Sequence, residues 1–256
     1  MEDYNDQSVN PDITNFFIKH VVAVAIRLEI GSTNQEPFIT ATVLQASNRW
    51  FLLTSAHWFD DIERLINSGY KISSIRLVDS LSNQAEFKMA IPFSVSNFHP
   101  IMLDSYDDEI DIAIIPLSPL YIDLLKRNDI QALDESTWKE LPSQFDACWM
   151  FGLPAEIQIS DNSHYSLTPL GLQVFLDEDC FRVPKGKKYP RLFGKVETRG
   201  IIQSLGGMSG GPILIYSNNK YWLIALQTRW NQDSRVIEAI PIKYLGGAIN
   251  KYYENS

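Results

Sequence analysis

The sequence predicts an all-β protein, a barrel or a sandwich, built in two halves. Short apolar runs rich in β-branched and aromatic residues recur along most of the chain, and turn residues separate them. Few segments have helical spacing, and no long repeat is present. Such a pattern is typical of all-β architectures. The 256 residues, 45% of them hydrophobic, are enough for two halves of roughly 110–125 residues, which is an ordinary domain size.

The first half is expected to span residues 16–135, after a flexible acidic leader at residues 1–15. Between its third and fourth strands, apolar residues recur at helical spacing over 58–68, and Gly69 ends this expected helix. The expected strands are the apolar runs at 17–30, 38–45, 50–55, 73–79, 85–95 and 110–117.

The second half is expected to span residues 136–256. Residues 118–141 have helical composition and lead into it. A basic loop at 185–188 is expected to be solvated. A closing helix over 242–252 is weakened by two consecutive glycines. The expected strands lie at 147–154, at several places within 156–200, and at 213–216, 221–228 and 236–242.

The composition restricts the partners and cofactors of the protein. Its net charge is −9 and its pI is near 4.9, which disfavours a nucleic-acid partner because such binding needs Lys and Arg to neutralise phosphates. The polar start lacks the apolar part of a secretory signal, and no apolar run would span a bilayer, so we expect a cytoplasmic protein without membrane contact. Cys148 and Cys180 lack a framework spacing and are expected to be reduced, a disulfide between them being the alternative. No Cys/His cluster has metal-ligand spacing, so neither a metal nor a cofactor is expected.

Ser209 is the centre of the most unusual stretch, Gly206–Pro212, in which glycines flank a serine on both sides. Glycine permits backbone conformations closed to other residues and lets another backbone approach closely. A serine nucleophile needs both properties, because its hydroxyl must be exposed and nearby N–H groups must face the developing oxyanion. The alternative for this stretch alone is a glycine-rich loop before a strand.

Two further polar residues lie at notable places in the expected strands: one directly follows a strand, and the other is a carboxylate whose burial would cost free energy. His57 directly follows an apolar strand and, taken alone, is more typical of a core or surface histidine. Asp111 lies inside the apolar run 110–117, where a carboxylate needs a partner, so an ion pair or a turn cap is its alternative role. Together with Ser209 they supply the nucleophile, base and acid of a catalytic triad, in one of the chain orders in which that triad recurs.

The motifs around these residues resemble those of the chymotrypsin-like (trypsin-fold) serine peptidases. They are Thr54–His57, Asp111–Ala113 and Gly207–Pro212, and the turn Gly152–Pro154 resembles the entry to the second barrel in bacterial members. The motifs fall within residues 17–242, which is most of the chain. The resemblance implies two antiparallel six-stranded β-barrels, with short helices and a C-terminal helix, and a site in the cleft between the barrels. It also implies a bacterial-type intracellular serine endopeptidase that cleaves protein or peptide substrates.

The roles of the site residues follow from the resemblance by position. His57 on the first barrel would be the general base and then the general acid, and Asp111 would orient it. Ser209 on the second barrel would attack the scissile carbonyl. The backbone N–H groups of Gly207 and Ser209 would form the oxyanion hole.

Three departures from the family pattern leave activation and specificity open. Met208 stands where the zymogen-activated branch has an aspartate that binds a new N-terminus, so that activation route is not expected. Gln203, at the usual position of primary specificity, predicts neither a basic nor an aromatic preference. The pocket strand carries Thr228, Arg229 and Trp230 without the glycines of digestive enzymes. Attraction of an acidic substrate side chain by Arg229 and closure of the pocket by Trp230 are hypotheses, and a solvent-facing position for both is the alternative.

Two functions of different classes are therefore compatible with the sequence. One is a selective, regulated serine endopeptidase, for which an activating partner protein is plausible. The other is a catalytically silent or partner-gated binding or scaffold protein on the same fold. An esterase of the α/β-hydrolase class fits poorly, because in that class the serine precedes its acid and histidine. Asp107 and Asp108 are alternative acids, and Asp111 is preferred because it enters the apolar strand.

Overall fold

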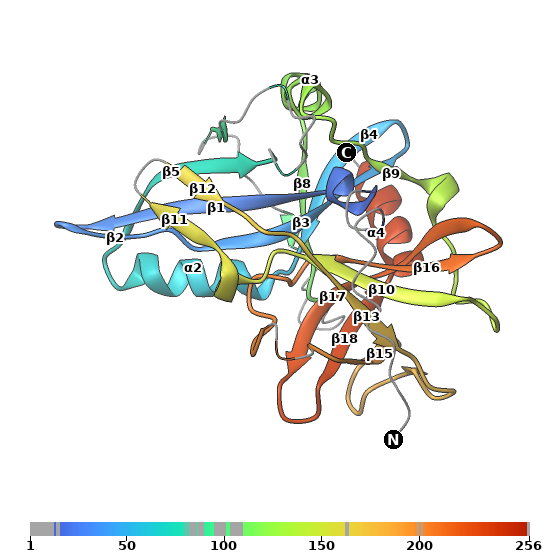
Figure 1. The fold of residues 1–256 in the computed structure, drawn as a ribbon. Helices are drawn as coiled ribbons and strands as arrows, with labels where there is room; N and C mark the ends of the chain where they lie inside the picture. The colour runs from blue at the N-terminus through green and yellow to red at the C-terminus, as the bar shows by residue number, and fades with distance from the viewer. Residues whose placement is uncertain are drawn as a thin grey trace.

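The chain folds into two β-sheets that lie side by side, with short helices around them (Figure 1). The structure is a computed structural model. It describes residues 13, 16–79, 81, 86, 90–94, 101–102, 110–161, 164–198, 200 and 202–254. The all-β class with two curled antiparallel sheets, a β-barrel and a C-terminal helix confirms the predicted fold class.

The first sheet has its strands in the order β6-β5-β1-β3-β4-β8-β7, with β2 paired to β1 and β9 paired to β3. All its pairings are antiparallel except the two-residue pairing of β3 with β9. Its strands are β1 (Val21–Ile30), β2 (Thr33–Gln35), β3 (Phe38–Ala46), β4 (Arg49–Thr54), β5 (Lys71–Val78), β6 (Ile91–Phe93), β7 (Ile101–Met102), β8 (Ala113–Pro116) and β9 (Leu133–Asp134).

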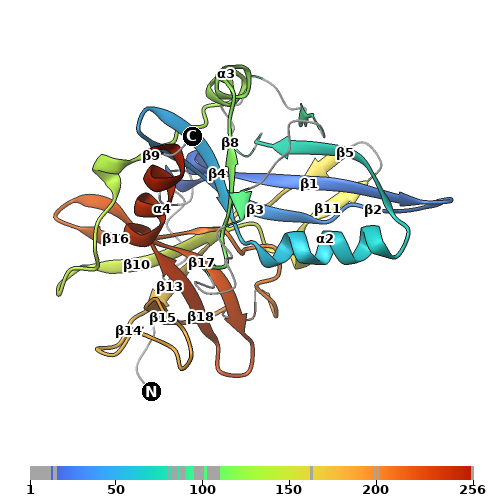
Figure 2. The same cartoon turned by 180° about the vertical axis from the view of Figure 1, so that it is seen from behind.

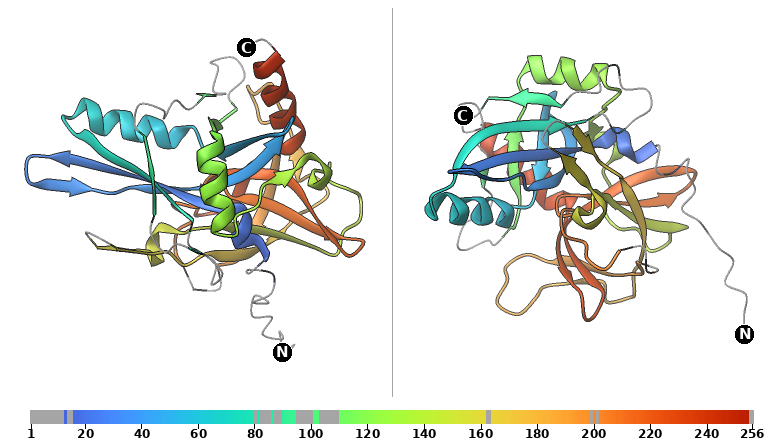
Figure 3. Two further views of the ribbon diagram at one scale, coloured as in Figure 1. Left: turned by 90° about the horizontal axis from the view of Figure 1, so that it is seen from above. Right: turned by 60° about the vertical axis from the view of Figure 1, so that its left-hand side comes forward.

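The second sheet closes on itself as a barrel, because β13 pairs with β10 at one side and with β15 at the other. The closed order is β13-β10-β16-β17-β18-β15, with β14 added outside β15, and Figure 3 shows these strands curling round. The strands are β10 (Ala147–Gly152), β13 (Leu170–Phe175), β14 (Phe181–Arg182), β15 (Arg191–Val196), β16 (Pro212–Ser217), β17 (Lys220–Asn231) and β18 (Val236–Pro241). A separate hairpin joins β11 (Ile159–Asp161) to β12 (His164–Ser166).

The helices cover the edges and the junction of the sheets. Helix α2 (His57–Asn67) packs Trp58 and Ile62 against one face of the first sheet. Helix α4 (Ile242–Glu254) contacts β17, β18 and β3, and so covers the junction of the two sheets (Figure 2). The described residues also contain α3 (Pro119–Arg127) and the short 3-10 helices η1 (Ile18–His20), η3 (Glu135–Thr137) and η4 (Ala155–Ile157).

Strand β4 shows how the sequence divides the core. Successive side chains of a strand point to opposite faces, so Leu52 packs into the core of the first sheet while Phe51 and Leu53 face a core shared by both sheets. The shared core also contains Ile112, Phe151, Leu226, Ile240 and Leu245, drawn from both sheets and α4. A third core fills the second barrel. The shared core fixes the two sheets against each other, which sets the geometry of any site between them.

Several element boundaries differ from the sequence-based expectation. The helical stretch expected over 118–141 is α-helical over Pro119–Arg127, after which Asp129 adopts φ +62° and turns the chain away, and it contains a short 3-10 helix at Glu135–Thr137. Of the strand expected over 85–95, β6 covers only Ile91–Phe93, and residues 85, 87–89 and 95 lie outside the described residues. The closing helix persists through its glycines, and a Cβ on Gly246 would come within 2.8 Å of the Trp138 ring. Close packing therefore explains that glycine.

Candidate active site

His57 and Asp111 meet because they flank neighbouring strands at the same end. Strands β4 and β8 pair antiparallel, with Thr54 opposite Ala113. The residues just after β4 and just before β8 therefore lie together. His57 Nδ1 lies 2.8 Å from Asp111 Oδ2, and the His57 backbone N–H donates to Asp111 Oδ1 at 2.9 Å. Asp111 thus orients the imidazole and also satisfies an N–H at the start of α2.

Ser55 completes this group and was not singled out from the sequence. Its hydroxyl donates to Asp111 Oδ1 at 3.0 Å, and its Oγ lies 2.6 Å from His57 Nδ1. A carboxylate only accepts hydrogen bonds, so the hydrogen of the neutral ring belongs on Nδ1, where Asp111 Oδ2 and Ser55 Oγ face it. His57 Nε2 then carries a lone pair and can act as a base.

The charges in this group stabilise each other. Burial alone would raise the pKa of Asp111, but the hydrogen bond and charge of His57, with the bonds from its backbone N–H and from Ser55, lower that pKa to about 2. The hydrogen bond to Asp111 raises the pKa of His57, against the opposing effects of burial and of Arg229. Asp111 is therefore ionised at neutral pH, and it stabilises the protonated imidazole as a triad acid does.

Ser209 lies in the loop that precedes β16, and threonines of the first sheet hold this loop. Thr40 donates to Gly207 O through both its backbone N–H (2.9 Å) and its hydroxyl (2.7 Å). The hydroxyl of Thr42 donates to Gly210 O at 2.6 Å. Because β3 is the neighbour of β4, these bonds hold the serine loop against the strand that leads to His57.

The serine hydroxyl itself donates to Thr228 O at 3.2 Å. Within the part of the chain that the structure describes, no hydrogen bond joins Ser209 to His57. The arrangement therefore contains a complete acid–base pair and a neighbouring serine whose hydroxyl points to another acceptor. Catalytic hydrogen bonds are often absent or long before substrate binds.

The N–H groups of Gly207 and Ser209 are oriented by the carbonyls in the same peptide units. A trans peptide directs its C=O and N–H in opposite directions. Gly206 O accepts from Ala155 N at 2.7 Å, and Met208 O accepts from Gly211 N at 2.9 Å. The N–H groups of Gly207 and Ser209 point away from these contacts, and neither donates to any described residue.

Glycine is required at three positions of the loop, and at one of them, Gly210, φ is +93° and a Cβ would collide with Thr40 O. Gly207 has φ +86°, and a Cβ there would lie 2.7 Å from Leu153 O. A Cβ on Gly211 would lie 2.0 Å from Phe151 O. Gly207 and Gly211 let the loop lie directly on the end of β10 and the turn that follows it.

The residues expected to bind substrate lie at two places. Thr228 is buried and accepts the Ser209 hydrogen bond, and the guanidinium of Arg229, 55% of whose side chain is exposed, has Nε 3.4 Å from Asp111 Oδ2. Gln203 is exposed at the start of the serine loop, where its backbone N–H donates to Glu156 Oε2. The structure thus brings Thr228 to Ser209 and Arg229 to Asp111, and it leaves Gln203 at the far end of the loop. The alternative acids Asp107 and Asp108 lie outside the described residues.

Other features bear on the predicted cofactors and compartment. Among the described residues, no group of three or more His, Cys, Asp or Glu side chains could hold a metal ion. Cys148 and Cys180 are free and buried, as expected. None of the helices in the described ranges is long and apolar enough to cross a membrane.

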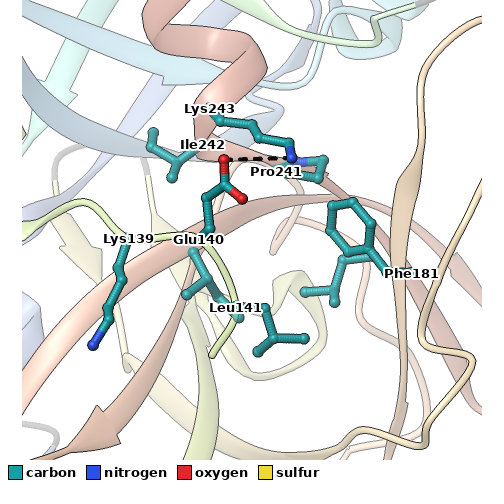
Figure 4. A pocket seen from close by; sticks show the side chains of 9 residues that line it. Lys139, Glu140, Leu141, Phe181, Pro241, Ile242 and Lys243 are labelled. Atoms are coloured by element: carbon teal, nitrogen blue, oxygen red, sulfur yellow. Dashed lines mark ion pairs between the residues drawn. The ribbon is translucent and has the colours of Figure 1, made fainter. Parts of the chain in front are cut away.

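A pocket of about 270 Å³ lies at the start of α4 and is separate from the triad (Figure 4). At its edge Lys243 Nζ lies 3.5 Å from Glu140 Oε1, and none of the predicted site residues lines it. Its apolar wall consists of Leu141, Phe181, Leu192, Ile224, Pro241 and Ile242.

No protein-family model matches the chain, and no curated protein matches its sequence. The solved structures to which it is similar include the thermostable serine protease AL20 from an extremophilic microorganism, with 11% identity over 87% of this chain and 91% of that chain and a TM-score of 0.48. They also include the protease Anisep from Arthrobacter nicotinovorans, with 15% identity over 87% and 90% and a TM-score of 0.49. A third comes from work on the coupled folding and binding of the Sesbania mosaic virus VPg protein, with 14% identity over 89% and 88% and a TM-score of 0.46. Likenesses this distant assign no activity, so the chemistry of this chain has to be argued from its own residues.

Proposed function

We propose that the protein is a serine endopeptidase of the chymotrypsin-like type, with Ser209 as nucleophile, His57 as base and Asp111 as acid. The observation that carries the proposal is the 2.8 Å contact of Asp111 with His57 Nδ1, beside a serine loop that threonines hold next to the same strand. The N–H groups of Gly207 and Ser209 have no other partner among the described residues and are the proposed oxyanion donors.

The proposed reaction begins when Ser209 Oγ turns from Thr228 O toward His57 Nε2. Oγ attacks the scissile carbonyl carbon while its proton passes to Nε2, and the carbonyl oxygen becomes an oxyanion. The imidazolium then protonates the leaving amine as the C–N bond breaks, which leaves an acyl-enzyme. Water, deprotonated by His57, attacks the ester, and the proton returns to Ser209 as the acid product leaves. Asp111 stays ionised throughout and stabilises the imidazolium.

We propose a protein or peptide substrate, a cytoplasmic location and no N-terminal activation. Met208 is fully buried in the second barrel core, where an apolar side chain fixes the loop without a new terminus. The free thiols suit a reducing compartment. A preference for an acidic side chain near Arg229 stays a hypothesis, since this guanidinium also contacts Asp111.

A second candidate is a binding protein of the same fold, in which Ser209 and His57 take up a productive arrangement only when a partner protein binds. The hydrogen bond of Ser209 to Thr228 O favours it, because a serine held there is not activated by His57. An activating partner would act by releasing this bond.

Labelling of the purified protein with a fluorophosphonate separates the two candidates. A peptidase should be labelled at Ser209 without any partner, and Ser209→Ala should abolish both labelling and cleavage of a peptide library. Ser68→Ala, at an exposed serine after α2, is the matched control and should leave both unchanged. Absence of labelling of the wild-type protein would contradict independent peptidase activity, and labelling only after addition of a partner would support the second candidate.

A further inference from the structure

The start of the serine loop is fastened by one exposed carboxylate. Glu156, in η4, accepts hydrogen bonds on a single oxygen, Oε2, from the backbone N–H groups of Gln203 (2.7 Å) and Ser204 (2.9 Å). Hydrogen bonds to an ionised acceptor are stronger than bonds between neutral groups. Two consecutive peptide units at the loop entrance are thereby fixed by one side chain.

The residue before Glu156 makes the next contact along the loop. Ala155 N donates to Gly206 O at 2.7 Å. This bond sets the peptide unit whose other end is the Gly207 N–H, because the unit is planar and trans. The serine loop therefore runs against η4 in two steps, first on the Glu156 carboxylate and then on the Ala155 N–H.

Apolar packing and the hydrogen bonds inside the loop entrance do not by themselves fix the orientation of the Gly206–Gly207 peptide unit. Leu205 is buried in the core of the second barrel, but apolar packing does not select which way a peptide carbonyl points. The bonds from Gly206 N to Ser204 Oγ (3.1 Å) and from Met208 N to Leu205 O (3.0 Å) stay inside the loop and would move with it. Glu156 is the side chain that ties these peptide units to η4.

We propose that Glu156 is a positioning residue for the peptidase reaction: its bonds to Gln203 and Ser204 keep Gly206 O on Ala155 N and so keep the Gly207 N–H directed at the oxyanion. The inference rests on the proposed function. Glu156 touches neither substrate nor triad in this role. It acts through the backbone, so its loss should weaken stabilisation of the transition state more than binding of the substrate.

Glu156 is exposed, so its substitution leaves no cavity in a core. Glu156→Ala is expected to lower kcat and the rate of fluorophosphonate labelling about 10-fold, less than the loss of an entire oxyanion donor, which costs about 10²- to 10³-fold. KM should stay within about twofold, because substrate binding does not need the oxyanion donor. Glu156→Gln should recover most of the rate, since an amide oxygen accepts the same two bonds. Glu178→Ala, at an exposed glutamate between β13 and β14, is the matched control and should match the wild type.

Amide hydrogen exchange makes the test independent of catalysis. In Glu156→Ala the amides of Gln203 and Ser204 should exchange at least 10-fold faster, with the melting temperature within about 2 °C of the wild type. Unchanged labelling in a protein whose wild type is labelled overturns the positioning role and leaves the peptidase proposal intact. A wild type that is never labelled overturns the peptidase proposal, and unchanged exchange at the two amides overturns the anchoring role of Glu156 whatever the activity.

Discussion

The two halves of the candidate site are held by different kinds of hydrogen bond. In the half from the first sheet, the side chains of Ser55, His57 and Asp111 bond to one another at 2.6 to 3.0 Å. In the half from the second sheet, residues 203–211 are held through their backbone carbonyls and N–H groups. The first half therefore consists of side chains that titrate or bond to a titrating group, whereas the serine loop itself contributes mainly backbone groups, with the Glu156 carboxylate as a charged partner outside the loop.

This difference separates two kinds of sensitivity. A change of pH should act mainly on the acid–base half, where the partners are side chains that titrate or bond to a titrating group. Added side-chain volume should destabilise the serine loop, because backbone atoms of other segments lie where a Cβ on its glycines would be. The following substitutions test each half against a control elsewhere in the chain.

The largest effect is expected from Asp111→Asn. The new amide would still accept the His57 backbone N–H through its oxygen, but it would present an NH₂ donor to Nδ1, so the ring would move its hydrogen to Nε2 and lose its base. We expect kcat to fall about 10³- to 10⁴-fold with little change in fold. Peptide hydrolysis and far-UV circular dichroism measure the two effects, with Asp123→Asn on the exposed face of α3 as control. A loss of less than about tenfold would remove Asp111 as the acid and favour Asp107 or Asp108.

The next effect tests the backbone half through Gly211→Ala. A Cβ would meet Phe151 O at 2.0 Å and Met208 O at 2.9 Å, and both are backbone atoms that can yield only if β10 moves away from the loop. We expect a loss of about 4 kcal/mol in the free energy of unfolding, measured by urea titration. Gly247→Ala is the control, because nothing lies within 4 Å of its Cβ in α4, and it should gain up to about 1 kcal/mol from helix propensity. Equal stability of the two variants would show that the loop does not lie on β10.

The same difference explains which parts of the site the sequence could predict. His57, Asp111 and Ser209 each lie in a short motif whose residue types indicate a possible chemical role. The apolar runs between turn residues predicted the strands of the two sheets. Thr40, by contrast, bonds to the carbonyl of a residue 167 positions away. A backbone carbonyl is present in every residue, so the sequence carries no sign of that pairing, and the same holds for Glu156 and the N–H groups of Gln203 and Ser204. Ser55 stood inside a recognised motif, but its bond to Asp111 required the register of β4 with β8.

Asp79 shows how burial changes the pKa of a carboxylate that lacks the hydrogen bonds Asp111 accepts from His57 and Ser55. Its Oδ2 accepts a hydrogen bond from Asn128 Nδ2 at 2.8 Å, but burial has the larger effect and raises its pKa to about 6. The folded-state pKa thus exceeds the unfolded value of about 3.9, so this group lowers the free energy of unfolding by up to about 3 kcal/mol as pH rises from about 4 to 6. Asp111 acts oppositely, since its contribution is present above about pH 3.9 and is lost as pH falls toward 2.

Asp79→Asn should abolish the Asp79 contribution to the pH dependence. The variant is expected to be more stable than the wild type by about 2 to 3 kcal/mol at pH 7 and closer to it at pH 4, as measured by urea unfolding at a series of pH values. Asp123→Asn, at an exposed carboxylate on α3, should leave the pH dependence unchanged. A variant that is destabilised at pH 7 would show that the Asp79 carboxylate is stabilised as an anion.

The smallest effect is expected from Arg229, a residue of the second half that contacts Asp111 of the first half. Its positive charge lowers the pKa of His57, against the larger raising effect of Asp111. Since the general base must be neutral, kcat/KM should increase with pH through the His57 pKa. Arg229→Gln removes the lowering influence and should move this limb of the profile to higher pH, with the plateau rate preserved. Arg235→Gln, in the turn between β17 and β18, removes the same charge as Arg229→Gln. It should leave the limb of the pH profile in place. A limb that moves to lower pH would mean that Arg229 acts mainly by holding Asp111 against His57, through the 3.4 Å contact of its Nε with Asp111 Oδ2.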